Sequence, residues 1–257
     1  MRSFVEDFHL LLDLLKQREP FAFNRFSDGE LFILQEKELI LDDKQVKVGA
    51  KVSDARYQSE DFKRFHPEEH SFYRDRLVES FRFRKKHYFK GLSCRCCVGD
   101  ENFRWQLDFH GEPDGNFTWA NLLVNGNYGR FIHEMYPVFN GYKTVFVCNE
   151  KADLSAFPFV VKEFRVGYNA MVNDYGLIET MKDWIGGNRI EGHLFLFSAS
   201  TFSKLAIHQL YEHHGGNTYV DVGTTLNAFM HMRIDRSYLK SFWLGEKGRD
   251  IRKICIW

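Results

Sequence analysis

The sequence predicts one α/β domain built around a Rossmann-like, mostly parallel sheet with helices on both faces. From residue 143 onward, short apolar runs alternate with amphipathic stretches, which is the pattern of strands connected by covering helices. The runs 145–148 and 194–197 are continuously apolar and 219–222 is apolar apart from Asp221, as expected for strands buried on both faces of a sheet. The 257 residues, of which 44% are hydrophobic, suffice for one large core. We therefore expect a single domain over 1–257.

The chain is expected to begin with a helix followed by a strand. Apolar residues recur at helical spacing between Phe4 and Leu15, and Pro20 requires that this helix has already ended. The run FAFNRF at 21–26 predicts a strand, and a helix through Leu34 follows a short turn. That turn lies at the carboxyl end of a strand, where open α/β sheets bind ligands.

The middle of the chain, at about 42–136, is interpreted as a variable basic and aromatic insertion within the domain. Its first part, 42–61, is polar and predicts a loop-rich lid, with Val46, Val48 and Val52 indicating a strand or hairpin. Residues 68–83 predict an amphipathic helix with a basic outer face. The elements expected next are a strand within 87–97 and two helices, 117–124 and 128–139, broken at Asn125-Gly126-Asn127.

Beyond residue 143 the predicted elements alternate along the chain. They are strand 144–150, strand 159–166, helix 169–185, strand 193–200, helix 201–213 and strand 218–223. A parallel sheet with covering helices is the simplest arrangement of this order.

Charge and hydropathy exclude several classes of protein. The formal net charge is zero and the pI is about 7.2, so the whole molecule is not an electrostatic binder of nucleic acid or membranes. No apolar run approaches the roughly 18 residues of a membrane span, and the N-terminus lacks the apolar core of a signal peptide. We expect a soluble, cytoplasmic protein without a transmembrane segment.

Three of the five cysteines, Cys94, Cys96 and Cys97, are crowded into one short segment. Such close spacing seldom forms an unstrained disulfide framework, which favours a reducing compartment. Zinc binding with His87 or His110 would call for a second pair of ligands that the sequence lacks. The favoured interpretation is therefore buried thiols on a strand.

The segment Asn24 to Glu30 combines site-like residues at the end of the first predicted strand. Asp28 and Glu30 are two residues apart, so an extended turn would project both carboxylates to one side. Two oxygen ligands of this kind can share a magnesium or manganese ion that also contacts phosphate oxygens. Arg25 adds the positive charge of its guanidinium group. The same residues also match a helix capping box formed by Ser27 and Glu30, so a capped turn is the alternative.

Two further segments follow strands of the second half. Ser198, Ser200 and Thr201 precede Lys204 at the start of a helix, where free backbone amides and a lysine suit a phosphate. A simple serine or threonine cap is the alternative. At the end of the last strand, Asp221 with Gly223 and Thr224 is typical of a ribose, base or substrate contact, with a plain turn as the alternative.

Taken together, RFSDGEL, FSASTFSKLAIHQL and GNTYVDVGTTLNAF followed by RSYL at 236–239 resemble the GT-D fold glycosyltransferases. The first described members of that family glucosylate bacterial serine-rich adhesins. The resemblance implies that Asp28 and Glu30 are catalytic carboxylates that bind a divalent metal, Mn²⁺ or Mg²⁺. It also implies that Arg25 and Lys204 face the nucleotide diphosphate and that Asp221 lies in the donor crevice.

Several positions depart from the family pattern. Ser27 stands where the family usually has glycine, Ser200 and Thr201 stand where a Gly-Pro pair is common, and Thr224 replaces a frequent histidine. We still expect contacts with the nucleotide sugar from Ser198, Ser200, Thr201, Gly223 and Thr224. The role of the family's histidine is not carried over to Thr224.

The resulting hypothesis is a metal-dependent hexosyl- or pentosyltransferase. It would pass a sugar from a nucleotide sugar, specifically a UDP-sugar, to a hydroxyl of a glycan or glycoprotein, and it would not bind nucleic acid. Candidate bases for the acceptor hydroxyl are Asp108, Glu134, Asp174 and Asp221. The alternatives are a polyanion or nucleic-acid binder using the basic and aromatic segment 74–95, and a Rossmann methyltransferase.

Overall fold

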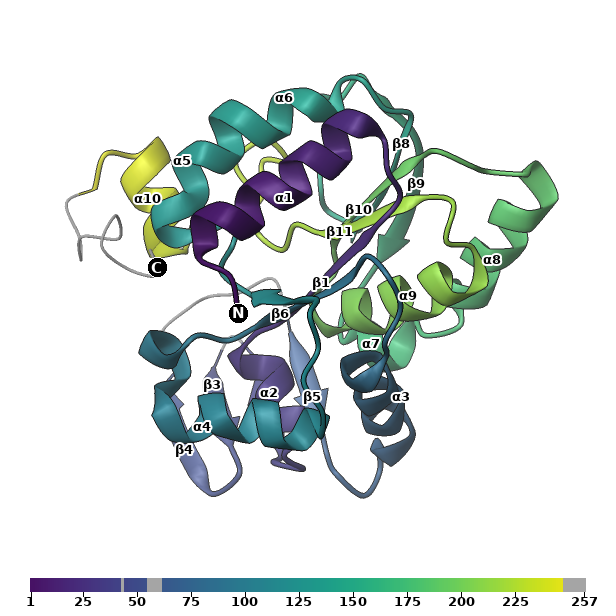
Figure 1. Ribbon diagram of the computed structural model, residues 1–257. Coiled ribbons are helices and arrows are strands. Elements are labelled where there is room, and N and C mark those ends of the chain that lie inside the picture. The colour runs from purple at the N-terminus through teal and green to yellow at the C-terminus, as the bar shows by residue number, and fades with distance from the viewer. Residues whose placement is uncertain (43, 55–61, 247–257) are drawn as a thin grey trace.

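The computed structural model describes residues 1–42, 44–54 and 62–246. Their centre is a seven-stranded sheet in which every adjacent pair of strands is parallel, so the predicted α/β fold class is confirmed (Figure 1). The strands, from one edge to the other, are β7 (Phe117–Trp119), β6 (Tyr88–Leu92), β1 (Ala22–Phe26), β11 (Thr218–Asp221), β10 (Leu194–Ser198), β8 (Thr144–Asn149) and β9 (Val160–Val166).

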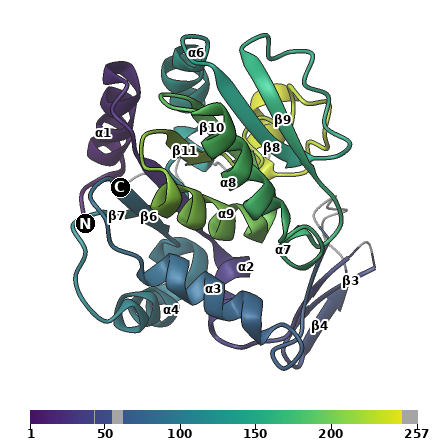
Figure 2. The same ribbon diagram turned by 90° about the vertical axis from the view of Figure 1, so that its right-hand side faces the viewer.

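Alternate residues of the central strands pack into two separate hydrophobic cores, one on each face of the sheet. On β10, Leu194 and Leu196 pack into the core beneath α1 (Phe4–Gln17), whereas Phe195 and Phe197 pack into the core beneath α9 (Ser200–His213). Figures 1 and 2 show α1 and α9 on opposite faces of the sheet. Burial on both faces explains why these strands are continuously apolar in the sequence.

The remaining helices complete the two layers. The α1 face also carries a helical run made of η1 (Asn125–Asn127), α5 (Tyr128–Arg130), the π-helical η2 (Phe131–Met135) and α6 (Tyr136–Phe139), together with α10 (Ser237–Trp243). The α9 face carries α2 (Asp28–Leu34), α3 (Ser71–Arg82), α4 (Arg95–His110), α7 (Ala170–Asn173) and α8 (Leu177–Asn188). Within the described ranges, no helix has both the length and the apolar character needed to cross a bilayer.

Strands β1 and β11 are neighbours in the sheet, but the chain leaves them toward opposite faces. The helix after β1 contributes Leu34 to the α9-side core, while the segment after β11 contributes Leu226 and Leu239 to the α1-side core. This divergence creates a crevice at the carboxyl ends of the two strands, which is where doubly wound sheets bind ligands.

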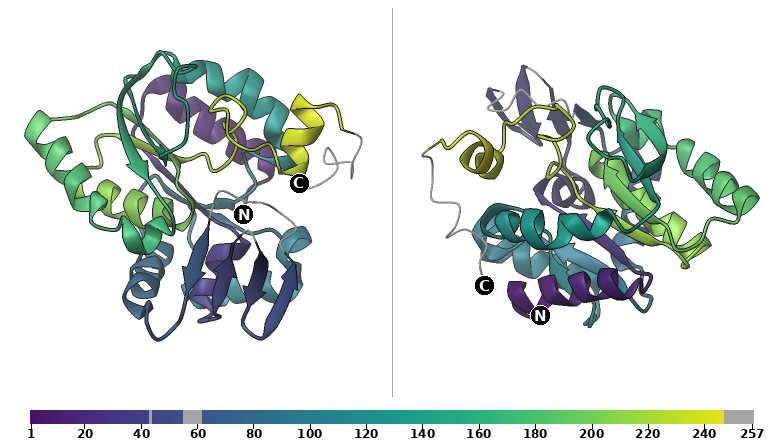
Figure 3. Two further views of the ribbon diagram at one scale, coloured as in Figure 1. Left: turned by 180° about the vertical axis from the view of Figure 1, so that it is seen from behind. Right: turned by 90° about the horizontal axis from the view of Figure 1, so that it is seen from above.

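A second, antiparallel sheet lies beside α2 (Figures 1 and 3). Its strands, in spatial order, are β4 (Lys51–Asp54), β3 (Gln45–Val48), β2 (Leu39–Leu41) and β5 (Lys63–Phe65). The hairpin indicated for 42–61 is thus confirmed over 45–54, and residues 55–61 lie outside the described part of the chain. The Asn169 side chain joins the sheet to the main body, because its Oδ1 accepts from the Arg64 amide and its Nδ2 donates to the Arg64 carbonyl, both at 3.1 Å.

The segment 42–136 does not lie apart from the central sheet, because it supplies both β6 and β7. The helix predicted for 117–124 is wrong: Phe117–Trp119 pairs with β6 at the edge of the sheet, and residues 120–124 form turns and a bend. An edge strand of this length is too short to carry a periodic signal. The helical run predicted for 128–139 is confirmed, but the predicted break at 125–127 is wrong, because these residues form the 3-10 helix η1 that leads directly into α5.

Two other expectations need correction. The helix predicted for 169–185 is divided into α7 and α8, and Asp174 between them accepts a 2.8 Å hydrogen bond from the Gly167 amide. The cysteines predicted to be buried on a strand instead begin a helix: Cys94 is its N-cap, and Cys96 and Cys97 are exposed in its first turn. The strand ends at Leu92, before the thiols are reached.

Candidate functional site

A cavity of about 640 Å³ opens at the carboxyl ends of β1, β10 and β11, between the central sheet and the small sheet. The three segments singled out in the sequence meet in its wall. From them come Arg25, Ser27, Asp28, Glu30, Ser198, Ser200, Lys204, Asp221, Gly223 and Thr224. Thr201 is the one predicted contact that does not line this cavity, since it is buried and points to Glu30.

Glu30 lies at the centre of the hydrogen bonding on the α2 side of the cavity. Its Oε1 accepts from Thr201 Oγ1 at 2.8 Å and from Lys63 Nζ at 3.1 Å, and its Oε2 accepts from the amide and the hydroxyl of Ser27 at 3.1 and 2.8 Å. Burial alone would raise the pKa of Glu30, but the ammonium groups of Lys63 and Lys204 and the two hydroxyls outweigh it and hold that pKa well below its ordinary value of 4.5. Glu30 is therefore an ionised, buried anchor.

Asp28 differs from Glu30 in its surroundings. It is exposed in the first turn of α2, and its Oδ1 accepts a 3.0 Å hydrogen bond from the adjacent Gly29 amide. Glu30, by contrast, already has four donors for the roughly four lone-pair positions of its carboxylate. The two carboxylates do not form an open pair of metal ligands here, and the capping contact from Ser27 to Glu30 is present.

Lys204 and Asp221 form a buried ion pair across the floor of the cavity. Lys204 Nζ lies 2.5 Å from Asp221 Oδ2 and 3.2 Å from the Ser200 carbonyl, while Asp221 Oδ1 accepts from the Gly223 amide at 3.0 Å. Both side chains are at most 5% exposed. The sequence predicted a diphosphate contact and a donor-crevice carboxylate at these positions, and the structure joins them in one neutral unit.

Arg25 is held against the end of β11. It is 8% exposed, and its Nε donates to the Ala120 carbonyl at 2.5 Å. Gly223 adopts a φ of +52°, and a Cβ at that position would collide with Arg25 Nη1. The glycine is therefore needed both for its left-handed backbone and for the close approach of the guanidinium.

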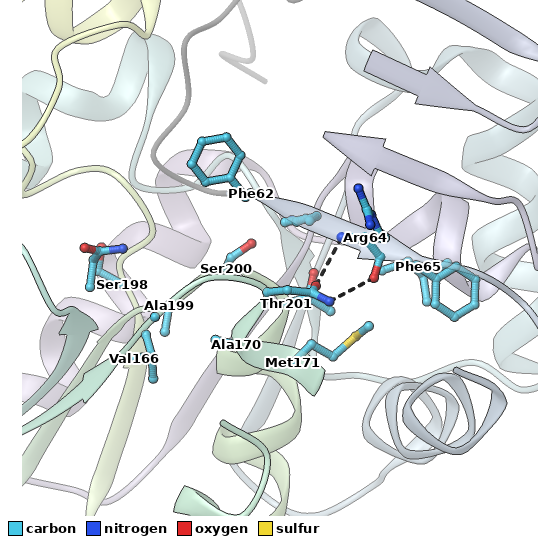
Figure 4. A pocket seen from close by; sticks show the side chains of 15 residues that line it. Phe62, Arg64, Phe65, Val166, Ala170, Met171, Ser198, Ala199, Ser200 and Thr201 are labelled. Carbon is cyan, nitrogen blue, oxygen red and sulfur yellow. Dashed lines mark hydrogen bonds between the residues drawn. The ribbon is translucent and has the colours of Figure 1, made fainter. Parts of the chain in front are cut away.

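The start of α9 presents a strained residue to the cavity. Ser200 has a φ of +54°, an uncommon value for a residue other than glycine, and its Oγ is buried without a hydrogen-bond partner among the described residues. Ser198, Ala199, Ser200 and Thr201 also border a small adjoining pocket, shown in Figure 4. A strained residue with an unsatisfied hydroxyl at a cavity wall is typical of a ligand contact.

Thr224 bonds to the protein itself. Its Oγ1 lies 2.7 Å from the hydroxyl of Tyr238, so it ties the end of β11 to α10. Tyr238 is buried and also lines the cavity.

Of the four predicted bases, only Asp221 lines the cavity. Asp108 is exposed on α4, Glu134 is exposed and 3.9 Å from His9, and Asp174 binds the Gly167 amide. The sequence reasoning missed Lys63, Arg233 and Asp235, which do line the cavity. Lys63 comes from a three-residue strand of the small sheet, and no pattern around it marks a site.

The basic residues of segment 74–95 are largely engaged within the protein. Arg74 pairs with Glu36, Arg84 pairs with Glu112, and Lys90 is fully buried with Asp114 as its partner. Arg82 donates to the Phe109 carbonyl and stacks over that ring. These contacts give Arg74, Arg82, Arg84 and Lys90 roles within the protein, while the side chains of Lys85 and Lys86 are exposed.

No protein-family model matches the sequence, and no curated protein matches it significantly. Solved structures do match. A structure described as a new glycosyltransferase, domain of unknown function 1792 from Streptococcus sanguinis, is 12% identical with a TM-score of 0.59, and the match covers 94% of this chain and 85% of that one. A second is described as showing that domain 1792 "has a distinct glycosyltransferase fold"; it is 11% identical with a TM-score of 0.54 and covers 86% and 79%. The chain therefore has this glycosyltransferase fold, as its resemblance to GT-D proteins predicted.

Proposed function

We propose that this chain, which shares its fold with a glycosyltransferase, transfers a sugar from a UDP-sugar to a hydroxyl of a glycan or glycoprotein. One observation carries the proposal: the three segments that resemble the GT-D pattern line a single cavity at the carboxyl ends of β1 and β11. Its volume of about 640 Å³ falls in the usual range for a small-molecule or cofactor site.

The charges around the cavity suit a departing nucleoside diphosphate. Arg25 has no buried carboxylate partner among the described residues, and the first turn of α9 adds backbone amides and the Ser200 hydroxyl. Fixed donors of this kind stabilise the negative charge that develops as the bond between sugar and phosphate breaks. Lys204 contributes less charge than its position suggests, because Asp221 neutralises it.

The acceptor hydroxyl must lose a proton as its oxygen bonds to the anomeric carbon. Four carboxylates line the cavity, and Glu30 and Asp221 are each committed to a lysine. Asp28 and Asp235 are left as the groups able to take the proton, and we place this role on Asp28 because it is exposed in the cavity wall.

Metal dependence stays a prediction. A divalent cation, when bound, would neutralise diphosphate charge, and it would take Asp28 as a ligand in place of the proton-accepting role. Glu30 does not fit as a second ligand while Lys63 and Thr201 occupy its Oε1. Lys63 already brings a positive charge to that point of the cavity wall.

The first test combines ligand screening with one substitution. Nucleotide sugars are screened by thermal shift with and without manganese, and turnover of the stabilising donor is then followed with glycan acceptors. We expect UDP-sugars to raise the melting temperature. Asp28→Asn should lower turnover about 100-fold or more, with an unchanged melting temperature, because it removes a proton acceptor from an exposed site.

Asp13→Asn, on the exposed side of α1, is the matched control and should keep full turnover. Full turnover by Asp28→Asn would remove Asp28 from the mechanism. Absence of both stabilisation and turnover with every nucleotide sugar would overturn the proposed function itself.

A further inference from the structure

The thiols of Cys94, Cys96 and Cys97 converge at the edge of the cavity. All three Sγ atoms lie within 4.8 Å of one another, with 3.0 Å between Cys94 and Cys96 and 3.9 Å between Cys96 and Cys97. Among the residues that the structure describes, no other group of three or more histidines, cysteines or carboxylates is this compact. Cys97 also lines the cavity.

The local fold explains the convergence. Cys94 has extended backbone angles and caps α4, and its carbonyl accepts from the amides of Cys97 and Val98 at 3.0 and 3.1 Å. This single turn folds the thiols of a four-residue segment toward one point. The preceding residue, Ser93, is buried and fixed by its hydroxyl to the Phe26 carbonyl at 3.0 Å, so the turn rests on β1.

We propose that these three cysteines form a binding site for a thiophilic cation, with zinc as the ion of choice. Tetrahedral zinc with Zn–S bonds of about 2.3 Å requires sulfurs about 3.8 Å apart. The observed separations lie on both sides of that value, so small side-chain rotations suffice. Thiolates favour soft or borderline cations over magnesium and calcium, which separates this site from any cation at Asp28.

A neighbouring amide is placed to hold two of the sulfurs. The Asn121 amide lies 3.4 Å from Cys94 Sγ and 3.3 Å from Cys97 Sγ, so it can donate to sulfur. Hydrogen bonds of this kind orient metal-bound ligands. Binding would release the thiol protons to solvent.

Three protein ligands leave a fourth position on tetrahedral zinc for water or another molecule. Cys97 and Asn121 both line the cavity, so that fourth position adjoins the cavity. The site is thus of the open kind rather than a closed structural centre. The inference does not depend on the proposed glycosyl transfer.

The test measures metal content and the ligand field. Reduced protein, kept in a phosphine reductant, is loaded with zinc, dialysed and analysed by mass spectrometry for metals, and a second sample is titrated with Co²⁺. Wild-type protein should hold about one equivalent of zinc and give the intense sulfur-to-cobalt charge-transfer bands of a tetrahedral thiolate site.

Cys96→Ser and Cys97→Ser are the informative variants, because both side chains are exposed and their loss should leave the fold intact. Each should reduce retained zinc at least about tenfold and weaken the charge-transfer bands. Cys148→Ala is the control: this thiol is buried in β8, where burial raises its pKa to about 11, and metal content should not change.

The inference is overturned if reduced wild-type protein retains no zinc and shows no cobalt charge transfer. It is equally overturned if the double variant Cys96→Ser/Cys97→Ser keeps the full metal content. A disulfide formed during purification does not confuse the outcome, since the reductant returns it to thiols.

Discussion

Glu30 shows how one residue of a site motif becomes part of the protein's framework. Its carboxylate is 1% exposed and joins α2, the small sheet through Lys63 and the start of α9 through Thr201. A buried charge is tolerated only when it is paired and hydrogen-bonded, and Glu30 has both kinds of partner. Changing Glu30 should therefore affect stability, and a loss of activity alone would not identify a metal ligand.

Replacing Glu30 with glutamine should lower the free energy of unfolding by about 2 to 4 kcal/mol near pH 7, because it leaves Lys63 without its buried counter-charge. The pKa of Glu30 is depressed in the folded state, so below about pH 4.5 the unfolded chain binds a proton that the folded chain does not. The stabilisation is complete above that pH and is lost on acidification, and the difference between wild type and variant should shrink accordingly.

Urea unfolding at several pH values measures this difference. Glu179→Gln is the control, because Glu179 is 67% exposed and pairs with Lys182 on the surface of α8, where such pairs contribute about 0.5 kcal/mol or less. Equal, small losses for both variants would contradict the structural role of Glu30.

At the scale of elements, the site depends on how closely α9 is fixed to the sheet. The buried Asn24 side chain on β1 donates from Nδ2 to the Lys204 carbonyl at 2.9 Å, and Ser80 Oγ of α3 donates to the same carbonyl at 2.8 Å. Two donors on one carbonyl fix the position of α9 along the sheet. The Lys204 side chain is thereby delivered to Asp221.

Backbone atoms also pack closely against Gly91 on β6, near the edge of the central sheet. A Cβ there would lie 2.9 Å from the Ala120 Cα and 3.0 Å from its nitrogen, which follow β7 and are backbone atoms. Gly91→Ala should therefore destabilise the protein by about 1 to 3 kcal/mol through overpacking. Chemical denaturation gives the value.

A second glycine offers a control with the opposite sign. Gly186 lies on the exposed side of α8, where an added Cβ would meet no atom within 4 Å. Gly186→Ala should stabilise by about 0.5 to 1 kcal/mol, since alanine loses less conformational entropy in a helix. A destabilised Gly186→Ala protein, or an unaffected Gly91→Ala protein, would show that the two backbones are not placed as described.

At the scale of the whole molecule, the cavity is bounded by two sheets that have separate hydrogen-bond networks. The central sheet contributes the ends of β1, β10 and β11, and the small sheet contributes Leu41, Val46 and Val48. The links between the two sheets include Asn169 with Arg64 and Glu30 with Lys63. A ligand in the cavity should therefore hold the two parts together.

If the proposed function is correct, UDP at about 100 times its Kd should stabilise the protein by about 2.7 kcal/mol. Hydrogen exchange should then slow on both sides of the cavity, in β3 and β4 and in the first turn of α9. The amides of α8, which does not line the cavity, serve as the internal reference. Protection confined to one sheet would place the nucleotide elsewhere than between them.

Much of the fold was predictable from the sequence because it follows from local pattern. Apolar runs predicted β8, β10 and β11, helical spacing predicted α1 and α3, and the alternation of elements predicted α9. The edge strand β7, the division of α7 from α8 and the helix α4 were not predicted. The extent of β7 depends on its pairing with β6, the division of α7 from α8 on the bond from the Gly167 amide to Asp174, and the start of α4 on Cys94 as its N-cap. None of these features leaves a periodic pattern in the sequence.

For the site, the sequence by itself determined which segments matter, because polar residues directly after buried strands must gather at one edge of a parallel sheet. Only the tertiary structure decided what each residue does there. Partners distant in the chain, Lys63 for Glu30 and Lys204 for Asp221, neutralise carboxylates that looked available in the sequence, and leave Asp28 exposed. The sequence gives the type of each ionisable side chain, but its burial and the opposite charge beside it are set only when the chain folds.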